Sequence, residues 1–246
     1  MTASVTQLRG TDLRVHFDGV KAVDGVDFNL SRGEVLGLIG PNGAGKTTLL
    51  NALTGYERPT TGTVHLDSSD VTRLPAHLRA RAGIVRSFQS VRVFEKLTAL
   101  ENVQIGALGG NLSNRDSLQL AWELLDNAGM GSRVLNPASS FPHGEERMLG
   151  ILRALAMKPK FLLLDEPAAG LNEVESIALA QFLAALPGRY DLGLLIVEHD
   201  MRVIMSACQR IHVIDYGKTI AVGTPAEVQK DPAVQAAYLG TSRGTA

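Results

Sequence analysis

A glycine-rich segment near the start of the chain has the residue types that bind a row of phosphates. The segment reads Gly40-Pro41-Asn42-Gly43-Ala44-Gly45-Lys46-Thr47 and matches the pattern G-x-x-x-x-G-K-[ST]. It lies between an apolar run, Val35–Ile39, that is typical of a buried strand and a helical pattern over residues 47–53. An ordinary glycine turn before a helix is the alternative, but it does not require all the fixed positions of this pattern. We therefore predict a triphosphate-binding loop.

Each residue type in this loop has a chemical role in binding a triphosphate. Glycines let successive backbone N–H groups turn inward toward phosphate oxygens, and the helix that follows adds its positive end. Lys46 supplies a positive charge to the β- and γ-phosphates, and the hydroxyl of Thr47 is a ligand for Mg²⁺. The predicted nucleotide-binding residues of this segment are Asn42, Gly43, Ala44, Gly45, Lys46, Thr47 and Thr48.

Two carboxylates follow a second apolar strand pattern, residues 161–164. Ligands of open α/β sheets bind at the carboxyl ends of the strands, so Asp165 is placed to bind Mg²⁺, directly or through water. Glu166 is placed to polarise the water that attacks the γ-phosphate. A solvated strand end before Pro167 is the alternative, but the phosphate loop upstream favours the catalytic interpretation.

Two further polar residues follow strand patterns. His199 comes after the apolar residues 194–197, and Gln89 comes after the strand pattern Ile84–Ser87. We expect His199 to hydrogen-bond the γ-phosphate and to help orient the water, and Gln89 to contact Mg²⁺ or the water. A lone histidine is usually structural, and a glutamine in a loop ordinarily has no role. Both assignments therefore depend on the neighbouring motifs.

Composition limits the class of protein. The chain has 246 residues with 24 Lys plus Arg against 25 Asp plus Glu, so it lacks the basic surplus of a typical nucleic-acid-binding protein. The single cysteine, Cys208, cannot form an internal disulfide, which fits a reducing cytoplasm, and we expect it to be a small core residue. No apolar run approaches the ~20 residues that cross a bilayer. We expect a soluble protein that other chains bring to a membrane.

The pattern of elements predicts an α/β fold, a P-loop NTPase core with a mostly parallel sheet covered by helices. Residues 5–30 predict an N-terminal antiparallel β layer, with turns at Asp18-Gly19 and Asp24-Gly25. Helical periodicity over 100–107 and 118–128 predicts a helical subdomain, residues 91–157, inserted into a core of residues 5–90 and 158–240. We treat residues 1–246 as a single nucleotide-binding domain.

The remaining elements follow from periodicity and caps. Strands are predicted at 64–66, 211–214 and 219–222, the last two joined by a turn at Tyr216-Gly217. Helices are predicted at 173–186, Met201–Ala207 and 232–239. A further helix is predicted to begin at Thr224-Pro225, where a hydroxyl cap precedes a proline.

Taken in order, these motifs resemble the ATP-binding subunits of ABC transporters over about residues 8–240. The resemblance implies ATP hydrolysis with Mg²⁺, a glutamine loop at Gln89, a switch histidine at His199 and Phe17 as the aromatic that stacks on adenine. The absence of an Asn-Lys-x-Asp sequence agrees with ATP over GTP. The resemblance to this family also implies a dimer with a second ATP-binding subunit, identical or not, beneath two permease subunits. Residues 88–94 are the candidate permease contact, with an ordinary hinge loop as the alternative.

Several stretches look like the branch that takes up branched-chain amino acids, whose relatives move urea or short amides. They include Arg86-Ser87-Phe88-Gln89 and Glu198-His199-Asp200-Met201. The resemblance implies an extracytoplasmic solute-binding protein and a peripheral, cytoplasmic position on the inner face of the plasma membrane. Two alternatives stay open: the ATPase of a lipopolysaccharide-type exporter, and a non-transport ABC ATPase of translation or DNA repair. The latter usually carries a second cassette, a coiled-coil insertion or basic arms, and the sequence has none of them.

One segment departs from the family pattern. The signature, usually Leu-Ser-Gly-Gly-Gln, here reads Phe141-Pro142-His143-Gly144-Glu145. Pro142 has neither a hydroxyl nor an N–H, and Gly144 alone keeps its type and is the predicted contact with the partner's ATP. Glu145 and Glu146 weaken the attraction for phosphate, and His143 is a substitute donor. We hypothesise weaker closure on the partner's nucleotide, against the alternative that backbone donors suffice.

Overall fold

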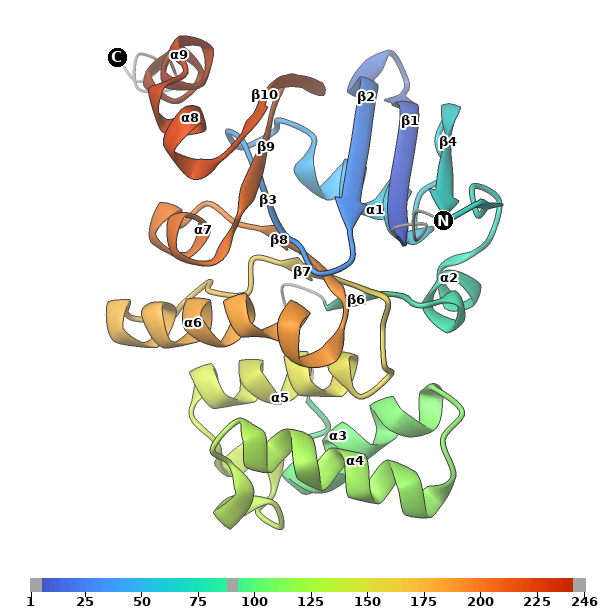
Figure 1. Cartoon of the computed structure of the whole chain (residues 1–246), viewed down its shortest axis with the longest axis vertical. Coiled ribbons are helices and arrows are strands. Elements are labelled where there is room, and N and C mark those ends of the chain that lie inside the picture. Colours follow the sequence, from blue (N-terminus) through green and yellow to red (C-terminus); the bar gives the residue numbers. More distant parts are fainter. Residues whose placement is uncertain (1–5, 88–92, 241–246) are drawn as a thin grey trace, which may run out of the picture.

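A six-stranded sheet forms the centre of the computed structural model, which describes residues 6–87 and 93–240 (Figure 1). Its strands run in the order β10 (Lys218–Gly223), β9 (Arg210–Asp215), β3 (Val35–Ile39), β8 (Gly193–Val197), β7 (Phe161–Asp165) and β6 (Ile84–Ser87). All neighbours are parallel except β10, which pairs antiparallel with β9. Every residue of β3, β7 and β8 is buried, as expected for strands covered on both faces.

A four-stranded antiparallel sheet confirms the predicted N-terminal layer. Its order is β2 (Val20–Ser31), β1 (Gln7–Phe17), β4 (Thr61–Leu66) and β5 (Ser69–Asp70). The turn at Asp18-Gly19 joins β1 to β2 with positive φ at both residues, as a two-residue hairpin requires. The predicted turn at Asp24-Gly25 is wrong, because both residues lie inside β2. Gly25, with φ of 80°, is the extra residue of a β-bulge between the pairs Leu13↔Val26 and Arg14↔Asp24.

Nine α-helices lie in the described ranges, and most agree with the sequence patterns. They are α1 (Lys46–Thr54), α2 (Ala76–Ala82), α3 (Ala99–Gly109), α4 (Asn114–Asn127), α5 (His143–Leu155), α6 (Glu173–Tyr190), α7 (Met201–Ala207), α8 (Pro225–Lys230) and α9 (Pro232–Gly240). The predicted cap of α8 is present, since the Thr224 side chain accepts a hydrogen bond from Glu227 N. Helix α6 extends past the predicted end at residue 186 and includes Pro187, which is buried.

Two hydrophobic cores lie on opposite faces of the large sheet. Side chains of β3 alternate between them: Val35 and Ile39 belong to one core, and Leu36 and Leu38 to the other. The first core continues into α3, α4 and α5, which lie together at one end of the molecule (Figure 1). The second contains α1 and the inner face of the antiparallel sheet. The phosphate loop thus begins and ends on elements that are buried.

A buried arginine holds the end of α1. Arg79 is fully buried and its guanidinium donates to Ala52 O at 2.6 Å, Leu53 O at 2.8 Å, Leu74 O at 3.0 Å and Thr72 O at 2.8 Å. Carbonyl groups at the end of a helix have no partner within the helix, and this side chain supplies one. Burial lowers the pKa of Arg79 to about 10.

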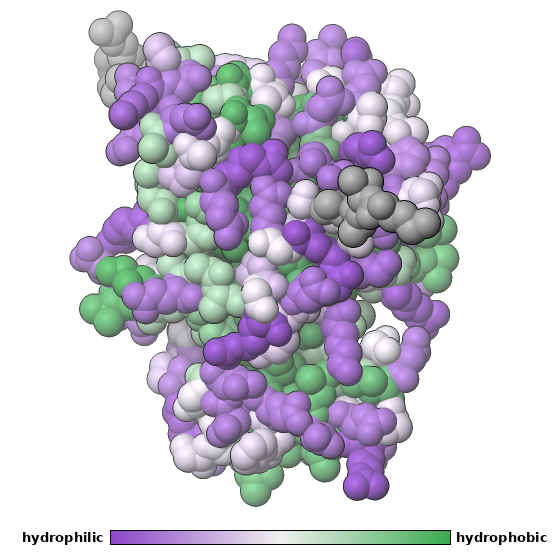
Figure 2. Space-filling view, in the orientation of Figure 1, coloured by the Kyte–Doolittle hydropathy of each residue, from purple (hydrophilic) through white to green (hydrophobic). Residues whose placement is uncertain are grey.

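Among the helices within residues 6–87 and 93–240, none has the length and apolar character needed to cross a bilayer. Figure 2 shows mostly hydrophilic residues on the face seen in Figure 1, with apolar residues in small groups between them.

Cys208 is buried at the end of α7, and burial raises the pKa of its thiol to about 12, as expected for a core residue.

Candidate functional site

The phosphate loop connects β3 to α1 and is pressed against neighbouring backbone. A Cβ on Gly40 would lie 2.0 Å from Ile214 O, and a Cβ on Gly45 would lie 2.2 Å from Ala22 O. Gly45 also has φ of 102°, in the left-handed region. Only glycine fits at these two positions, so the pattern in the sequence has a direct steric cause.

A cavity of about 370 Å³ opens over this loop. Its volume lies in the range of small-molecule sites. Its walls contain all the nucleotide-binding residues predicted from the loop, together with Glu166. The lining residues are Val20, Lys21, Ala22, Asn42, Gly43, Ala44, Gly45, Lys46, Thr47, Thr48, Glu166 and Tyr216.

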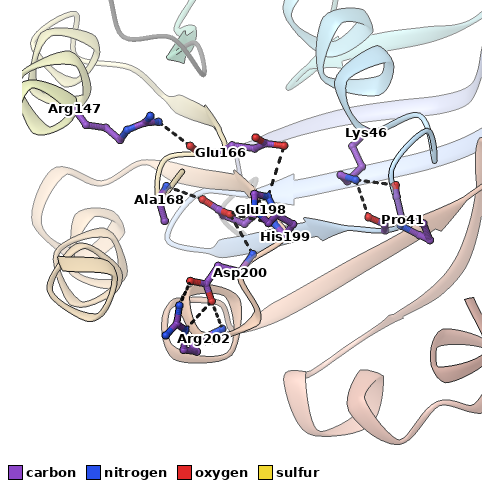
Figure 3. Close-up of polar contacts among 10 residues, drawn as sticks. Pro41, Lys46, Arg147, Glu166, Ala168, Glu198, His199, Asp200 and Arg202 are labelled. Atoms are coloured by element: carbon purple, nitrogen blue, oxygen red, sulfur yellow. Dashed lines mark hydrogen bonds and ion pairs between the residues drawn. The ribbon is translucent and has the colours of Figure 1, made fainter. Parts of the chain in front are cut away.

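The ammonium group of Lys46 lies inside the loop. Its Nζ donates to Gly40 O at 2.7 Å and to Pro41 O at 2.9 Å (Figure 3). Burial lowers the pKa of Lys46, and the nearby carboxylates of Glu166 and Asp165 oppose that shift. Lys46 is the first residue of α1 and thus adds a positive charge to the helix N-terminus, where anions bind favourably.

Asp165, the last residue of β7, is buried and ion-paired. Arg86 Nη2 of β6 lies 2.6 Å from Asp165 Oδ2, and Arg86 also hydrogen-bonds Asn51 Oδ1 on α1. Arg86 therefore links the acidic strand end to the helix of the phosphate loop. Arg86 entered the sequence-based expectations only as part of a family resemblance, and its contact with Asp165 was not predicted. A hydrophobic strand that contains an arginine is the signal, because a buried guanidinium requires a partner.

Glu166 has an uncommon backbone conformation. Its φ is 46°, in the left-handed region, and two hydrogen bonds hold it there. The backbone N–H donates to Val197 O at 2.8 Å, and the carbonyl accepts from Arg147 Nη1 of α5 at 2.8 Å. His199 Nδ1 lies 3.8 Å from Glu166 Oε1 (Figure 3). The predicted catalytic pair is therefore brought together at the carboxyl ends of β7 and β8.

Glu198 organises the segments around this pair and was given no role by the sequence analysis. Its carboxylate is fully buried and accepts hydrogen bonds from Ala168 N at 2.6 Å, His199 N at 3.0 Å and Asp200 N at 3.3 Å (Figure 3). A buried charge is stable when backbone N–H groups surround it. Glu198 thus fixes the segment after Glu166 relative to His199.

The donors at this edge suit Mg²⁺ held together with a phosphate. Within residues 6–87 and 93–240, no group of three or more His, Cys, Asp or Glu side chains forms a metal site. Mg²⁺ usually binds one or two protein oxygens plus substrate phosphates, and Thr47 and Asp165 offer oxygens of that kind. Gln89, the third predicted ligand, lies outside the described residues.

Four predicted site residues in the described ranges are absent from the cavity wall: Phe17, Gly144, Asp165 and His199. Phe17 ends β1 with 46% of its surface exposed, and the cavity wall begins at Val20. Gly144, near the start of α5, lines a separate cavity of about 450 Å³ next to Leu171 and Glu175. The chain by itself therefore does not bring Gly144 to its own phosphate loop.

The divergent signature forms the start of α5. Pro142 is the N-cap and makes no side-chain capping hydrogen bond. Glu145 Oε1 lies 2.5 Å from Arg133 Nη2, so an ion pair offsets one of the two negative charges at this helix end. His143 lies against Gly170, where an added Cβ would be 3.4 Å from the imidazole Nε2.

Comparison with known families identifies the fold. A family model described as "ABC transporter" matches residues 23–169, which include the phosphate loop, the signature and the acidic strand. The chain belongs to the ABC transporter family. A second model, for the branched-chain amino acid ATP-binding cassette transporter, matches residues 218–243. The predicted resemblance, fold class and ATPase class are therefore confirmed.

Curated relatives of this ABC transporter chain cover nearly its whole length. It is 37% identical to the high-affinity branched-chain amino acid transport ATP-binding protein BraF of Pseudomonas aeruginosa, over 98% of this chain and 99% of the relative. It is 38% identical to LivG of Salmonella typhimurium, over 93% of this chain and 95% of the relative. A lipopolysaccharide export system ATP-binding protein, LptB of Haemophilus influenzae, is 35% identical over 95% and 97%.

Solved structures agree with the fold. One is the ADP conformation of an ATP-binding cassette of an ABC transporter, with a TM-score of 0.86, 28% identity and coverage of 96% of this chain and 99% of that chain. Another is a dimeric cassette in a post-hydrolysis state bound to ADP and Pi, with a TM-score of 0.76, 25% identity and coverage of 89% and 98%.

Proposed function

We propose that this chain is the ATP-binding and ATP-hydrolysing subunit of an ABC importer for branched-chain amino acids or a related small polar solute such as urea or an amide. One observation carries the proposal: the predicted phosphate-loop residues and Glu166 line a single cavity. The family match at residues 218–243 and the BraF and LivG relatives support the choice of branch.

Catalysis in this proposal is positioning and charge stabilisation. The amides of the loop and the ammonium of Lys46 bind the β- and γ-phosphates of ATP. Thr47, Asp165 and Gln89 would hold Mg²⁺, which would neutralise phosphate charge. Phe17 stacks on adenine from the end of β1.

The attacking water is handled by two side chains. The Glu166 carboxylate accepts a proton from the water, and His199 hydrogen-bonds the γ-phosphate and keeps the water in line. The 3.8 Å separation of His199 Nδ1 and Glu166 Oε1 supports a shared task. The left-handed backbone of Glu166, fixed by Arg147 and Val197, aims its carboxylate at the cavity over the loop.

The working assembly has four transport subunits. Two ATP-binding subunits, identical or different, lie beneath two permease subunits on the cytoplasmic face of the plasma membrane, and an external solute-binding protein delivers the solute. The dimeric cassette among the solved structures supports pairing of such chains. We propose no nucleic-acid partner, which the charge balance supports. Residues 91–157 act as the helical insertion in the core of residues 5–90 and 158–240, with residues 88–94 at the permease.

The signature acts on the partner's nucleotide. Gly144 and the N-terminus of α5 face the ATP held by the second subunit, and Pro142 and His143 make this contact weaker than a serine and a glycine do. In a heterodimer, the two ATP sites are then unequal. Gly144 lines a different cavity from the one over this chain's own phosphate loop, which supports an arrangement across the dimer.

A second candidate is the ATPase of a lipopolysaccharide exporter. The 35% identity to LptB of Haemophilus influenzae favours it. The match of residues 218–243 to the branched-chain amino acid model favours the importer instead. A non-transport ABC ATPase has no observation in its favour.

Affinity purification from the native membrane separates these candidates. The tagged chain, extracted in mild detergent, is expected to co-purify with two permease subunits. In a separate assay, a strain that lacks the gene is expected to show impaired uptake of branched-chain amino acids or a small amide. Recovery of lipopolysaccharide-transport components instead contradicts the importer. The Lys46→Ala chain is the matched control for ATP-dependent uptake.

A further inference from the structure

The turn between β9 and β10 contains an aromatic residue in a conformation that disfavours it. Asp215 pairs with Lys218, so the loop has two residues, Tyr216 and Gly217, with φ of 46° and 74°. Two consecutive positive φ values are typical of a hairpin turn that usually contains Asn, Asp or Gly. Gly217 fits this rule, but Tyr216 does not, because a bulky side chain at positive φ is strained.

Hydrogen bonds fix this turn to the phosphate loop. Gly217 N donates to Ala44 O at 2.9 Å, and Asp24 N of β2 donates to Gly217 O at 2.8 Å. A Cβ on Gly217 would lie 2.9 Å from Ala22 O, so the turn and β2 are in close contact. Tyr216 is therefore held at a constant place beside the loop.

The Tyr216 side chain is 84% exposed, yet it lines the cavity over the loop. No other described residue of that wall is aromatic, and Val20, Lys21 and Ala22 of β2 belong to the same wall. A ring that is mostly in water adds little to the core. Packing therefore does not explain why the turn keeps a strained tyrosine, and strain of this kind is often retained at binding sites.

We propose that Tyr216 stacks on the base of the nucleotide whose phosphates the loop binds. This inference rests on the proposed function and adds a specific contact to it. An exposed ring beside a phosphate site matches the chemistry of base recognition, since every base presents a flat π face. Tyr216 then provides a second ring, from the β9–β10 turn, in addition to Phe17 at the end of β1.

Calorimetric titration with ADP and with pyrophosphate, both in magnesium buffer, tests the contact without hydrolysis. Tyr216→Ala and Tyr216→Asn are expected to weaken ADP binding about tenfold and to leave pyrophosphate binding within about twofold. Tyr216→Phe is expected to keep ADP affinity, because the ring remains. Trp122→Ala, which removes an exposed ring on α4, is the control and is expected to change neither.

The strained backbone of Tyr216 is tested separately by thermal unfolding. Tyr216→Asn is expected to raise the Tm of the nucleotide-free chain by about 2 °C, because asparagine tolerates positive φ. Higher stability with lower ADP affinity is the combination expected of a functional residue. Equal loss of ADP and pyrophosphate binding, unchanged ADP binding in Tyr216→Ala, or loss in Tyr216→Phe as large as in Tyr216→Ala overturns the inference. Failure of the wild-type chain to bind either ligand overturns the proposed function instead.

Discussion

The imidazole Nδ1 of His199 lies 3.8 Å from the carboxylate Oε1 of Glu166, although the two residues are far apart in the chain. Parallel pairing of β7 with β8 places their carboxyl ends side by side, since Asp165 pairs with Val197. Glu166 follows β7 directly and His199 lies two residues beyond the end of β8, so the sheet brings both to the same edge.

Replacement of Glu166 by glutamine is expected to lower the ATP hydrolysis rate at least about 100-fold, because an amide cannot accept the proton of the water. ADP affinity is expected to stay within about threefold, since the phosphate loop is unchanged. Phosphate release and ADP titration measure the two effects. Glu173→Gln, at an exposed carboxylate, is the matched control. Hydrolysis by Glu166→Gln at the wild-type rate contradicts the assignment.

Glu198→Gln is expected to destabilise the fold by about 3 kcal/mol. The amide NH₂ group cannot accept a hydrogen bond, so at least one of the three backbone N–H groups held by the carboxylate loses its partner. Urea unfolding monitored by circular dichroism measures the change. A loss below about 1 kcal/mol means that the carboxylate does not organise these segments.

The sequence predicts the catalytic motifs because each is local. Gly40 and Gly45 signal close backbone contacts, and the apolar runs before Asp165 and His199 signal strand ends at one edge. The α/β order and the N-terminal antiparallel layer follow from periodicity in the same way.

Contacts between distant segments are not visible in such patterns. Glu198 binds the backbone of Ala168, 30 residues away, and Arg86 binds Asp165, 79 residues away. Backbone N–H groups are the same in every residue, so no sequence signal marks Ala168 as a partner of Glu198. An arginine in an apolar strand signals that it needs a partner, but the sequence does not say that the partner is Asp165. Gly25 has the appearance of a turn residue, but pairing of β1 with β2 on both sides makes it a bulge.

Acid is expected to weaken the fold through His212. Burial, with a contribution from Arg210, lowers the pKa of His212 from 6.5 to about 4. Between these values the unfolded chain binds more protons than the folded one, so stability is present above pH 6.5 and is lost as pH falls toward 4. The loss is about 3 kcal/mol at most.

The comparison with His212→Gln isolates this effect, because glutamine still reaches the Thr219 hydroxyl but does not titrate. Urea unfolding at pH 7, 5.5 and 4.5 is expected to show a steeper fall for the wild-type chain. Parallel curves for the two chains contradict the assignment.

Two substitutions return positions 142 and 143 of the signature to the residue types usual in the family. Pro142→Ser with His143→Gly is expected to raise single-turnover hydrolysis in the assembled dimer by up to about tenfold, because a hydroxyl and a less crowded helix N-terminus become available to phosphate. Rapid-quench kinetics and dimerisation on ATP measure the gain. If neither the hydrolysis rate nor dimerisation on ATP increases, the backbone N–H groups of the present signature are sufficient for contact with the partner's nucleotide.

The central claim is that the amides around Lys46 bind the phosphates of a nucleotide, and titration of the purified chain with ADP and magnesium tests it most directly. The wild-type chain is expected to bind one ADP, and Lys46→Ala is expected to bind it about 30-fold more weakly with the same circular dichroism spectrum. A folded wild-type chain that takes up no ADP contradicts the claim.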